Sequence, residues 1–118
     1  MEAFEKMKVL GIKPDDQTFN QLMLAHAKAK DIEAVEELNS IATTQYHLPP
    51  SIQRMNALIV AYAKSNQGEN AEKVLRELKA MGLTPDVISY TTVIDAYKRV
   101  GNFKKCWELY DNYEMYES

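Results

Sequence analysis

Cysteine, histidine and glycine are scarce in this chain, and their scarcity removes several classes of function. The 118 residues include one cysteine, two histidines and four glycines. Cys106 has no partner for an internal disulfide, which suits a reducing compartment. His26 and His47 have no cysteine at metal-ligand spacing, so we expect no zinc site. The sequence also lacks a glycine-rich phosphate loop, a nucleophile elbow and paired catalytic acids, so we predict no enzyme, no cofactor and no small-molecule substrate.

The chain also lacks long hydrophobic runs. No stretch approaches the roughly 18 consecutive apolar residues of a membrane span, and we expect no membrane partner. Residues 1–6 are amphipathic and contain acids, unlike a secretory signal or a transit peptide. Apolar residues make up 46% and charged residues 26%, as in an ordinary soluble protein. The net charge of -3 argues mildly against a nucleic-acid partner, because phosphate binding requires lysine and arginine.

What the chain does contain is an internal repeat. Residues 11–15 (Gly-Ile-Lys-Pro-Asp) recur as residues 82–86 (Gly-Leu-Thr-Pro-Asp), and residues 48–51 lie near the midpoint between them. A second phrase keeps the same period, since residues 19–28 align with residues 55–64 and 90–99. Agreement of three copies at several positions indicates a repeat of about 35 residues.

Each copy has the pattern of two amphipathic helices. In the first helix, apolar side chains recur at i, i+3, i+4 and i+7. They are Met55, Leu58, Ile59 and Tyr62 in the middle copy, Phe19, Leu22 and Met23 before it, and Tyr90, Val93, Ile94 and Tyr97 after it. After a polar break, a second stripe contains Ile32, Val35 and Leu38, then Ala71, Val74, Leu75 and Leu78, then Phe103, Cys106, Leu109, Tyr110 and Tyr113. This spacing predicts an all-α fold with first helices at about 16–30, 52–66 and 87–101.

Turn residues separate the units. We expect Gly82 to end a second helix, because glycine adopts the left-handed cap conformation cheaply, and Asp86 to cap the first helix that follows. The predicted units are the second helix of a partial repeat at 1–15, repeats at 16–51 and 52–86, and a repeat truncated at its end at 87–118. One helical pair cannot bury both of its faces, so such units stack. The chain is therefore expected to be a segment of a longer array, or else a complete small protein.

This repeat resembles the pentatricopeptide repeat, a helical hairpin of about 35 residues. The likeness rests on an ending Gly-x-x-Pro-Asp (82–86) and on a restart Asn-x-Leu-Ile (56–59), which returns after an aromatic residue as Tyr-Thr-Thr-Val-Ile (90–94). It covers essentially the whole chain. The Trp-x-x-Leu-Gly-x-x-Tyr opening of the tetratricopeptide repeat is absent. The resemblance implies a right-handed α-α superhelix, a solenoid that binds single-stranded RNA and serves RNA processing or a related step in mitochondria or plastids.

The resemblance also implies which side chains meet the RNA, at one base per repeat. The fifth and last residues of a unit would bond the base edge, and the second residue would pack on the base face. The fifth residues are Asn20, Asn56 and Thr91, the last residues are Ser51 and Asp86 (with Asp15 for the partial unit), and the second residues are Gln17, Gln53 and Ile88. By the family's code, Asn56 with Asp86 would favour uracil and Asn20 with Ser51 cytosine, whereas Thr91 suggests a purine.

The net charge of -3 argues against a nucleic-acid partner only if the charges are spread evenly, and they are not. The predicted first helices contain six basic residues, Lys28, Lys30, Arg54, Lys64, Lys98 and Arg99, against only Asp16 and Asp95. Their sum is +4, which leaves -7 for the remainder of the chain. Lys28, Lys64 and Arg99 recur at one repeat position and would form a ladder suited to a phosphate backbone. The alternative is that this position faces solvent, where basic residues are common.

A second function stays open, namely a helical-repeat scaffold for protein partners within a larger organellar complex. The acidic total, the glutamines Gln17 and Gln53 in place of the family's usual valine or isoleucine, and the irregular unit 16–51 favour it. Asn20, Asn56 and Thr91 could then be ordinary polar residues of a first helical turn. Trp107, Tyr110, Tyr113 and Tyr116 could form an aromatic platform for bases, but their helical spacing favours packing.

Overall fold

Six helices in three hairpin pairs form the described part of the chain. The computed structural model describes the backbone of residues 11 and 14–117, and no strand occurs there. The helices are α2 (Asp16–Lys28), α3 (Ile32–Thr44), α4 (Ile52–Lys64), α5 (Gly68–Ala80), α6 (Val87–Arg99) and α7 (Phe103–Glu117). The predicted all-α repeat is confirmed, whereas the helix expected within 1–15 lies outside the described residues. Among the described helices, none is both long and apolar enough to cross a membrane.

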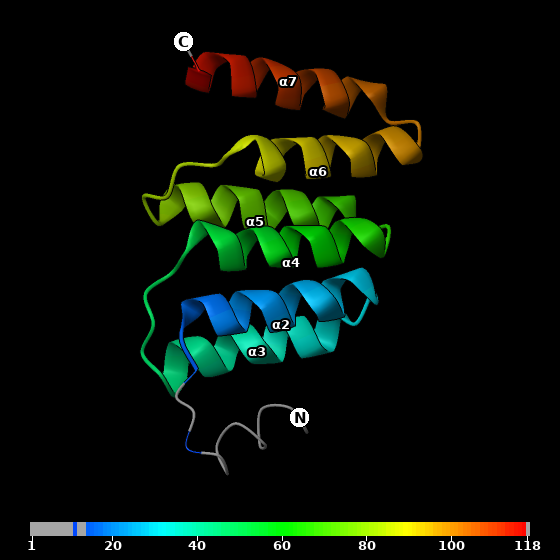
Figure 1. Cartoon of the computed structure of the whole chain (residues 1–118). Helices are drawn as coiled ribbons and strands as arrows, with labels where there is room; N and C mark the ends of the chain where they lie inside the picture. Colours follow the sequence, from blue (N-terminus) through cyan, green and yellow to red (C-terminus); the bar gives the residue numbers. More distant parts are fainter. Residues whose placement is uncertain (1–10, 12–13, 118) are drawn as a thin grey trace.

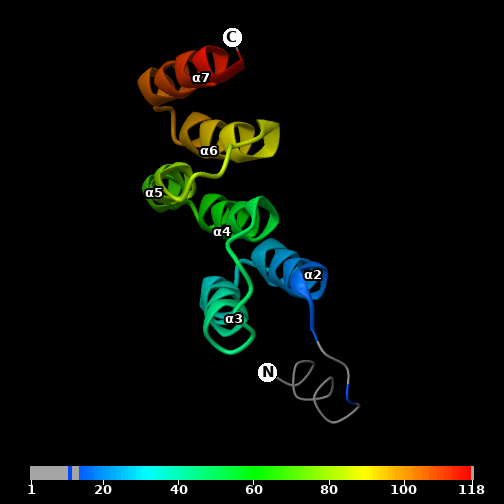
Figure 2. The ribbon, with the colours of Figure 1, turned by 90° about the vertical axis from the view of Figure 1, so that its left-hand side faces the viewer.

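The helices form two rows. The first helices of the pairs pack side by side, α2 against α4 and α4 against α6, and each second helix packs against the first helix of its own pair. The helices α3 and α5 also contact the first helix of the following pair. Figure 1 shows the successive pairs stacked along the long axis, and in Figure 2 α3 and α5 lie on one side of the row α2, α4 and α6. The result is an elongated body of 49 × 28 × 17 Å.

The first helices begin at capping side chains that end the preceding segment. Asp15, Ser51 and Asp86 each accept a hydrogen bond from the backbone N–H three residues further along. This satisfies one of the four N–H groups that a helix start leaves without a partner. At the other boundary, α5 ends before Gly82, whose φ of +86° lets the next N–H bond back to the carbonyl of Leu78 at 3.0 Å. The predicted roles of Asp86 and Gly82 are therefore confirmed.

The first helices are two residues shorter than predicted. Each turn between the two helices of a pair contains a residue with positive φ: Lys30 at 63°, Asn66 at 60° and Gly101 at 79°. A residue in this conformation cannot extend a right-handed helix. The predicted helices were too long because they included these turn residues.

The core follows the two predicted stripes with a correction at the last helix. The buried side chains include Phe19, Met23, Met55, Ile59, Tyr90 and Val93 of the first helices and Val35, Leu38, Ala71, Leu75, Leu78 and Leu109 of the second. Phe103 and Tyr110, which were predicted to share this stripe, are 60% and 45% exposed. In α5 the residue at the same repeat position as Phe103 is Gly68, which lies against Ala96 and Tyr97 of α6. No first helix covers the equivalent face of α7 in the described part of the chain, so these aromatic side chains face solvent.

Consecutive pairs are also joined by an equivalent hydrogen bond that the apolar pattern does not reveal. The Tyr62 hydroxyl of α4 donates to Glu36 of α3 at 2.5 Å, and the Tyr97 hydroxyl of α6 donates to Glu72 of α5 at 2.7 Å. Burial and the carboxylate of Glu36 raise the pKa of Tyr62 to about 12. Burial alone would raise the pKa of Glu72, but hydrogen bonds from Tyr97, Arg76 and Lys105 outweigh it and lower that pKa.

Candidate nucleic-acid interface

The second positions and the basic ladder form one stripe along each first helix. The stripe pairs Gln17 with Lys28, Gln53 with Lys64, and Ile88 with Arg99. The two members of a pair lie about three helical turns apart, so they share a face at a separation of about 16 Å. All six are exposed. The stripe is therefore accessible to a ligand that runs across the row of first helices.

Three of the predicted residues meet in one hollow between α4 and α6. This hollow has a volume of about 490 Å³ and is lined by Val60, Ala63, Lys64, Thr91, Thr92, Asp95 and Arg99. Lys64 is the last residue of α4, Thr91 lies in the second turn of α6, and Arg99 is the last residue of α6. The Thr91 hydroxyl donates to the carbonyl of Val87 in its own helix at 2.6 Å and leaves its lone pairs toward solvent.

The three basic residues of the ladder differ in their surroundings. Lys28 and Lys64 are exposed and form no ion pair within the described residues. Arg99 is already engaged, because it donates to the carbonyl of Ala63 at 2.6 Å and lies 3.5 Å from the carboxylate of Asp95. Arginine commonly satisfies the free carbonyls at a helix end in this way. The free positive charge of the ladder is therefore concentrated at the two lysines.

Asn56 and Asp86, the fifth and last residues of unit 52–86, lie in contact. The Asn56 side-chain N–H donates to the two carboxylate oxygens of Asp86 at 3.1 and 3.3 Å. The Asn56 carbonyl oxygen accepts from the hydroxyl of Ser89 at 2.5 Å, and only 7% of Asn56 is exposed. Burial would raise the pKa of Asp86, but the backbone N–H of Ser89 and the amide of Asn56 hold it below its usual value. The pair therefore presents an ionised carboxylate beside an amide of fixed orientation.

The equivalent residues of unit 16–51 are not joined. No hydrogen bond connects Asn20 to Ser51 in the described structure. The Ser51 hydroxyl instead donates to Asp16 at 3.1 Å and accepts from the backbone N–H of Arg54 at 3.2 Å. Asn20 is only half-buried. The structure thus brings together the predicted base-reading pair in one unit and separates it in the other.

Arg54 is not available to a phosphate backbone, although it was counted among the six basic residues of the predicted first helices. Only 1% of this side chain is exposed. Its guanidinium donates to Asp16 at 2.7 Å and to Asn39 at 2.9 Å, and it also contacts the carbonyls of Leu48 and Pro49. Because its partner Asp16 was one of the two acids counted against it, the pair cancels, and the other charged residues of the predicted first helices still sum to +4. Sequence reasoning could not separate Arg54 from the exposed lysines, because a basic residue is usually solvent-facing.

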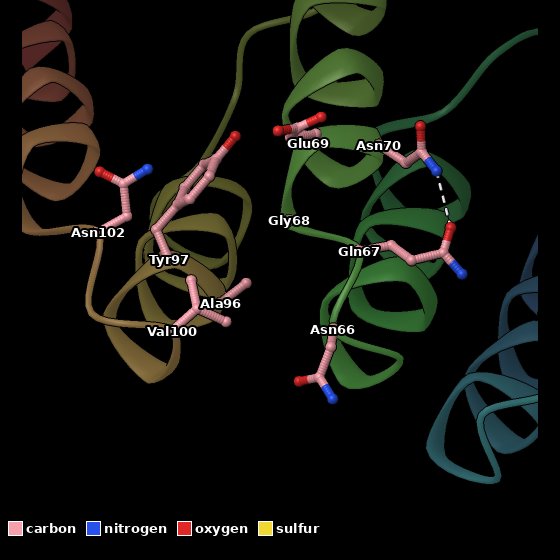
Figure 3. A pocket seen from close by; sticks show the side chains of 9 residues that line it. All are labelled: Asn66, Gln67, Gly68, Glu69, Asn70, Ala96, Tyr97, Val100 and Asn102. Atoms are coloured by element: carbon pink, nitrogen blue, oxygen red, sulfur yellow. Dashed lines mark hydrogen bonds between the residues drawn. The ribbon is translucent and has the colours of Figure 1, made fainter.

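A second hollow, shown in Figure 3, lies on the edge formed by the turns of the last two pairs. It has a volume of about 370 Å³, and its polar side chains are mainly amides, with a hydrogen bond of 2.7 Å from Asn70 to Gln67. It contains none of the predicted RNA-binding residues. The described residues also include no group of three histidine, cysteine or acidic side chains that could hold a metal ion. The hollow between α4 and α6 is therefore the candidate site.

Comparison with known protein families agrees with the repeat observed in the fold. The family described as PPR repeat family matches residues 50–99, and that described as PPR repeat matches residues 88–114. The family described as Pentatricopeptide repeat domain matches residues 2–65, more than half of the chain. The chain belongs to the pentatricopeptide repeat family.

Curated relatives are pentatricopeptide repeat-containing proteins of Arabidopsis thaliana. One is 29% identical over 103 residues, which cover 86% of this chain and 18% of the relative. Another is 31% identical over 114 residues and covers 94% of this chain and 22% of the relative. A third, named as mitochondrial, is 27% identical over 96 residues, or 81% of this chain and 24% of the relative. This pentatricopeptide repeat chain therefore spans less than a quarter of the length of these relatives.

Solved structures of PPR10 from maize have the same fold. One matches with a TM-score of 0.78 at 27% identity and covers 92% of this chain and 15% of PPR10. A second, of PPR10 in complex with an 18-nt psaJ RNA element, matches with a TM-score of 0.81 at 33% identity. It covers 94% of this chain and 16% of PPR10. The likeness supports an all-α repeat superhelix for the pentatricopeptide repeats of this chain.

Proposed function

We propose that these pentatricopeptide repeats bind single-stranded RNA across the row of first helices, at one base per repeat. The observation that carries the proposal is the hollow in which Lys64, Thr91 and Arg99 converge from consecutive first helices. The complex of PPR10 with RNA supports it, because that protein shares the fold at 33% identity. The protein would serve RNA metabolism in an organelle, as the mitochondrial name of one relative suggests.

The proposed binding divides into a charge contribution and a base contribution. Lys28 and Lys64, exposed at the same position of successive units, would bind the phosphate backbone and contribute affinity for any sequence. The base edge would meet the fifth and last residues, for which Asn56 with Asp86 is the assembled example. The second residue, such as the half-exposed Ile88, would pack on the base face. The activity proposed for this arrangement is binding alone.

The test is an amide NMR titration of the chain with short single-stranded RNA, because this method detects even millimolar binding. We expect shifts centred on Lys64, Thr91 and Arg99 that are larger for RNA than for DNA and weaken with salt. The double variant Lys28→Glu and Lys64→Glu should make the slope of log affinity against log salt less negative by about 1.4, at ~0.7 for each lost phosphate contact.

The matched control is Lys73→Glu with Lys104→Glu, which makes the same charge change at exposed positions of the second helices. These substitutions should leave the affinity and its salt dependence nearly unchanged. Equal losses of RNA affinity in the two double variants would mean that net charge alone, and not the position of the lysines, causes the effect. A complete absence of shifts at low salt would reject RNA binding and favour the protein-scaffold function.

A further inference from the structure

We propose that Ser89 is a specificity-determining residue of unit 52–86, although it belongs to the following unit. By fixing the orientation of the Asn56 amide, it would set which base the pair of Asn56 and Asp86 selects. The inference rests on the proposed RNA-binding function and adds to it a side chain outside the fifth, last and second positions of the unit.

Ser89 lies at the contact between α4 and α6 and is fully buried. Its hydroxyl has two candidate acceptors, the Asn56 carbonyl oxygen at 2.5 Å and a carboxylate oxygen of Asp86 at 3.0 Å. Its oxygen also accepts from the backbone N–H of Asp86 at 3.2 Å. A hydroxyl has a single proton to donate, and the shorter distance assigns that proton to Asn56.

The amide of Asn56 is therefore held at both ends. An ionised carboxylate accepts but cannot donate, so Asp86 fixes the position of the amide nitrogen, and the donated proton of Ser89 fixes the position of the oxygen. The two ends of an amide have nearly the same shape but opposite hydrogen-bonding character. Turning the amide over would exchange a donor for an acceptor at the same place, and a base edge that fits one arrangement does not fit the other.

The preceding unit provides an internal contrast. The residue that corresponds to Ser89 in the preceding copy of the repeat is Arg54, whose guanidinium is directed to Asp16 and Asn39 instead. Asn20, the counterpart of Asn56, consequently lacks a hydroxyl partner of this kind within the described residues. We infer that unit 16–51 selects its base less strictly than unit 52–86. The third residue of the following unit, and not only the last residue of the unit itself, would then decide how strictly a unit selects.

The experiment compares Ser89→Ala, which removes the hydroxyl, with Ser89→Thr, which keeps it. In the free protein, the side-chain amide signals of Asn56 should shift and broaden in Ser89→Ala and remain close to the parent in Ser89→Thr. With four RNA oligomers that differ only at the base opposite unit 52–86, discrimination among bases should fall roughly three- to ten-fold in Ser89→Ala, as expected for one lost hydrogen bond. The average affinity over the four oligomers should change less than two-fold.

If Ser89→Ala does not fold, Ser89→Thr and Ser89→Val are compared instead. Their side chains have nearly the same shape and only threonine has a hydroxyl, so a difference between them reports the hydroxyl and not the packing. Retained discrimination in Ser89→Ala or Ser89→Val, with unchanged Asn56 amide signals, would overturn the role of Ser89. A parent protein that binds no RNA, or binds all four oligomers equally, would instead reject the proposed function. The Asn56 signals of the free protein distinguish these two failures because they require no RNA.

Discussion

Arg54 is a charged side chain in the interior, and acceptors from three segments surround its guanidinium. Asp16 comes from the start of α2, Asn39 from α3, and the carbonyls of Leu48 and Pro49 from the connection to α4. A buried cation is tolerated only when it is paired and its N–H groups find acceptors. Arg54 thereby stabilises the irregular connection that precedes Ser51, where the repeat gains one residue relative to its successor.

Replacing Arg54 should therefore cost much more stability than replacing an exposed cation. In Arg54→Met, two backbone carbonyls and Asn39 lose their donor, and we expect the free energy of unfolding to fall by about 2–4 kcal/mol. Lys73→Met, at an exposed site of α5, should change it by less than about 0.5 kcal/mol. Urea unfolding followed by circular dichroism measures both. Similar values for the two variants would mean that the buried network contributes no net stability.

The last residues of the units show how one side chain combines a local role with a proposed binding role. Asp15, Ser51 and Asp86 all cap the first helix that follows them. Capping alone accounts for the choice of aspartate and serine at these positions. The additional contact with Asn56 is what distinguishes Asp86 from Asp15 and Ser51 in the described residues.

Between elements, the two tyrosine–glutamate hydrogen bonds are equivalent in the repeat but unequal in environment. Glu36 is exposed, whereas Glu72 is nearly buried and also receives Arg76 and Lys105. A hydrogen bond to a buried charged group contributes more than one at the surface, because its loss leaves the group without part of its solvation. The second bond therefore holds α5 to α6 more firmly than the first holds α3 to α4.

We expect Tyr97→Phe to lower the free energy of unfolding by about 1–2 kcal/mol and Tyr62→Phe by less than about 1 kcal/mol. Both substitutions remove a single hydroxyl and keep the ring, so each serves as the control for the other. Chemical denaturation of the two variants and the parent gives the comparison. An effect of Tyr62→Phe as large as that of Tyr97→Phe would show that burial of the glutamate does not set the strength of this contact.

At the scale of the molecule, the helical pairs of the described residues contact only their neighbouring pairs. In the described structure α2 and α3 contact α4 but not α5, α6 or α7, although the buried side chains form one continuous cluster. Stability in such an arrangement is approximately a sum of unit terms and nearest-neighbour terms. A destabilised unit can then open without its distant neighbours.

Leu109→Ala in α7 and Leu38→Ala in α3 test this directly. Both leucines are buried, and truncation of such a side chain costs about 2–5 kcal/mol. Native-state hydrogen exchange should accelerate in α6 and α7 for Leu109→Ala and in α2 and α3 for Leu38→Ala. The distant pair should keep the exchange rates of the parent in each case. Uniform acceleration across all helices in both variants would instead indicate one cooperative unit.

The sequence by itself determined the features that depend on local chemistry and on period. The recurrence of the same phrases positioned the pairs, the i, i+3, i+4, i+7 spacing identified most buried side chains, and Gly82 and Asp86 marked a boundary. These signals are readable because capping, turn conformation and the burial of one helix face act within a few residues of the chain. The predicted division into units and the assignment of RNA-binding residues remain predictions.

Only the tertiary structure decided which polar side chains meet. Arg54 and Lys64 look alike in the sequence, yet one is enclosed by three segments and the other is exposed. The hydrogen bond between Asn56 and Ser89 joins two different units, and its counterpart in the preceding unit is absent from the described residues. Such contacts depend on the packing of one pair against the next and on the identity of both partners. A repeat pattern shows which positions are equivalent, but equivalent positions form different bonds when a single residue in the facing helix changes.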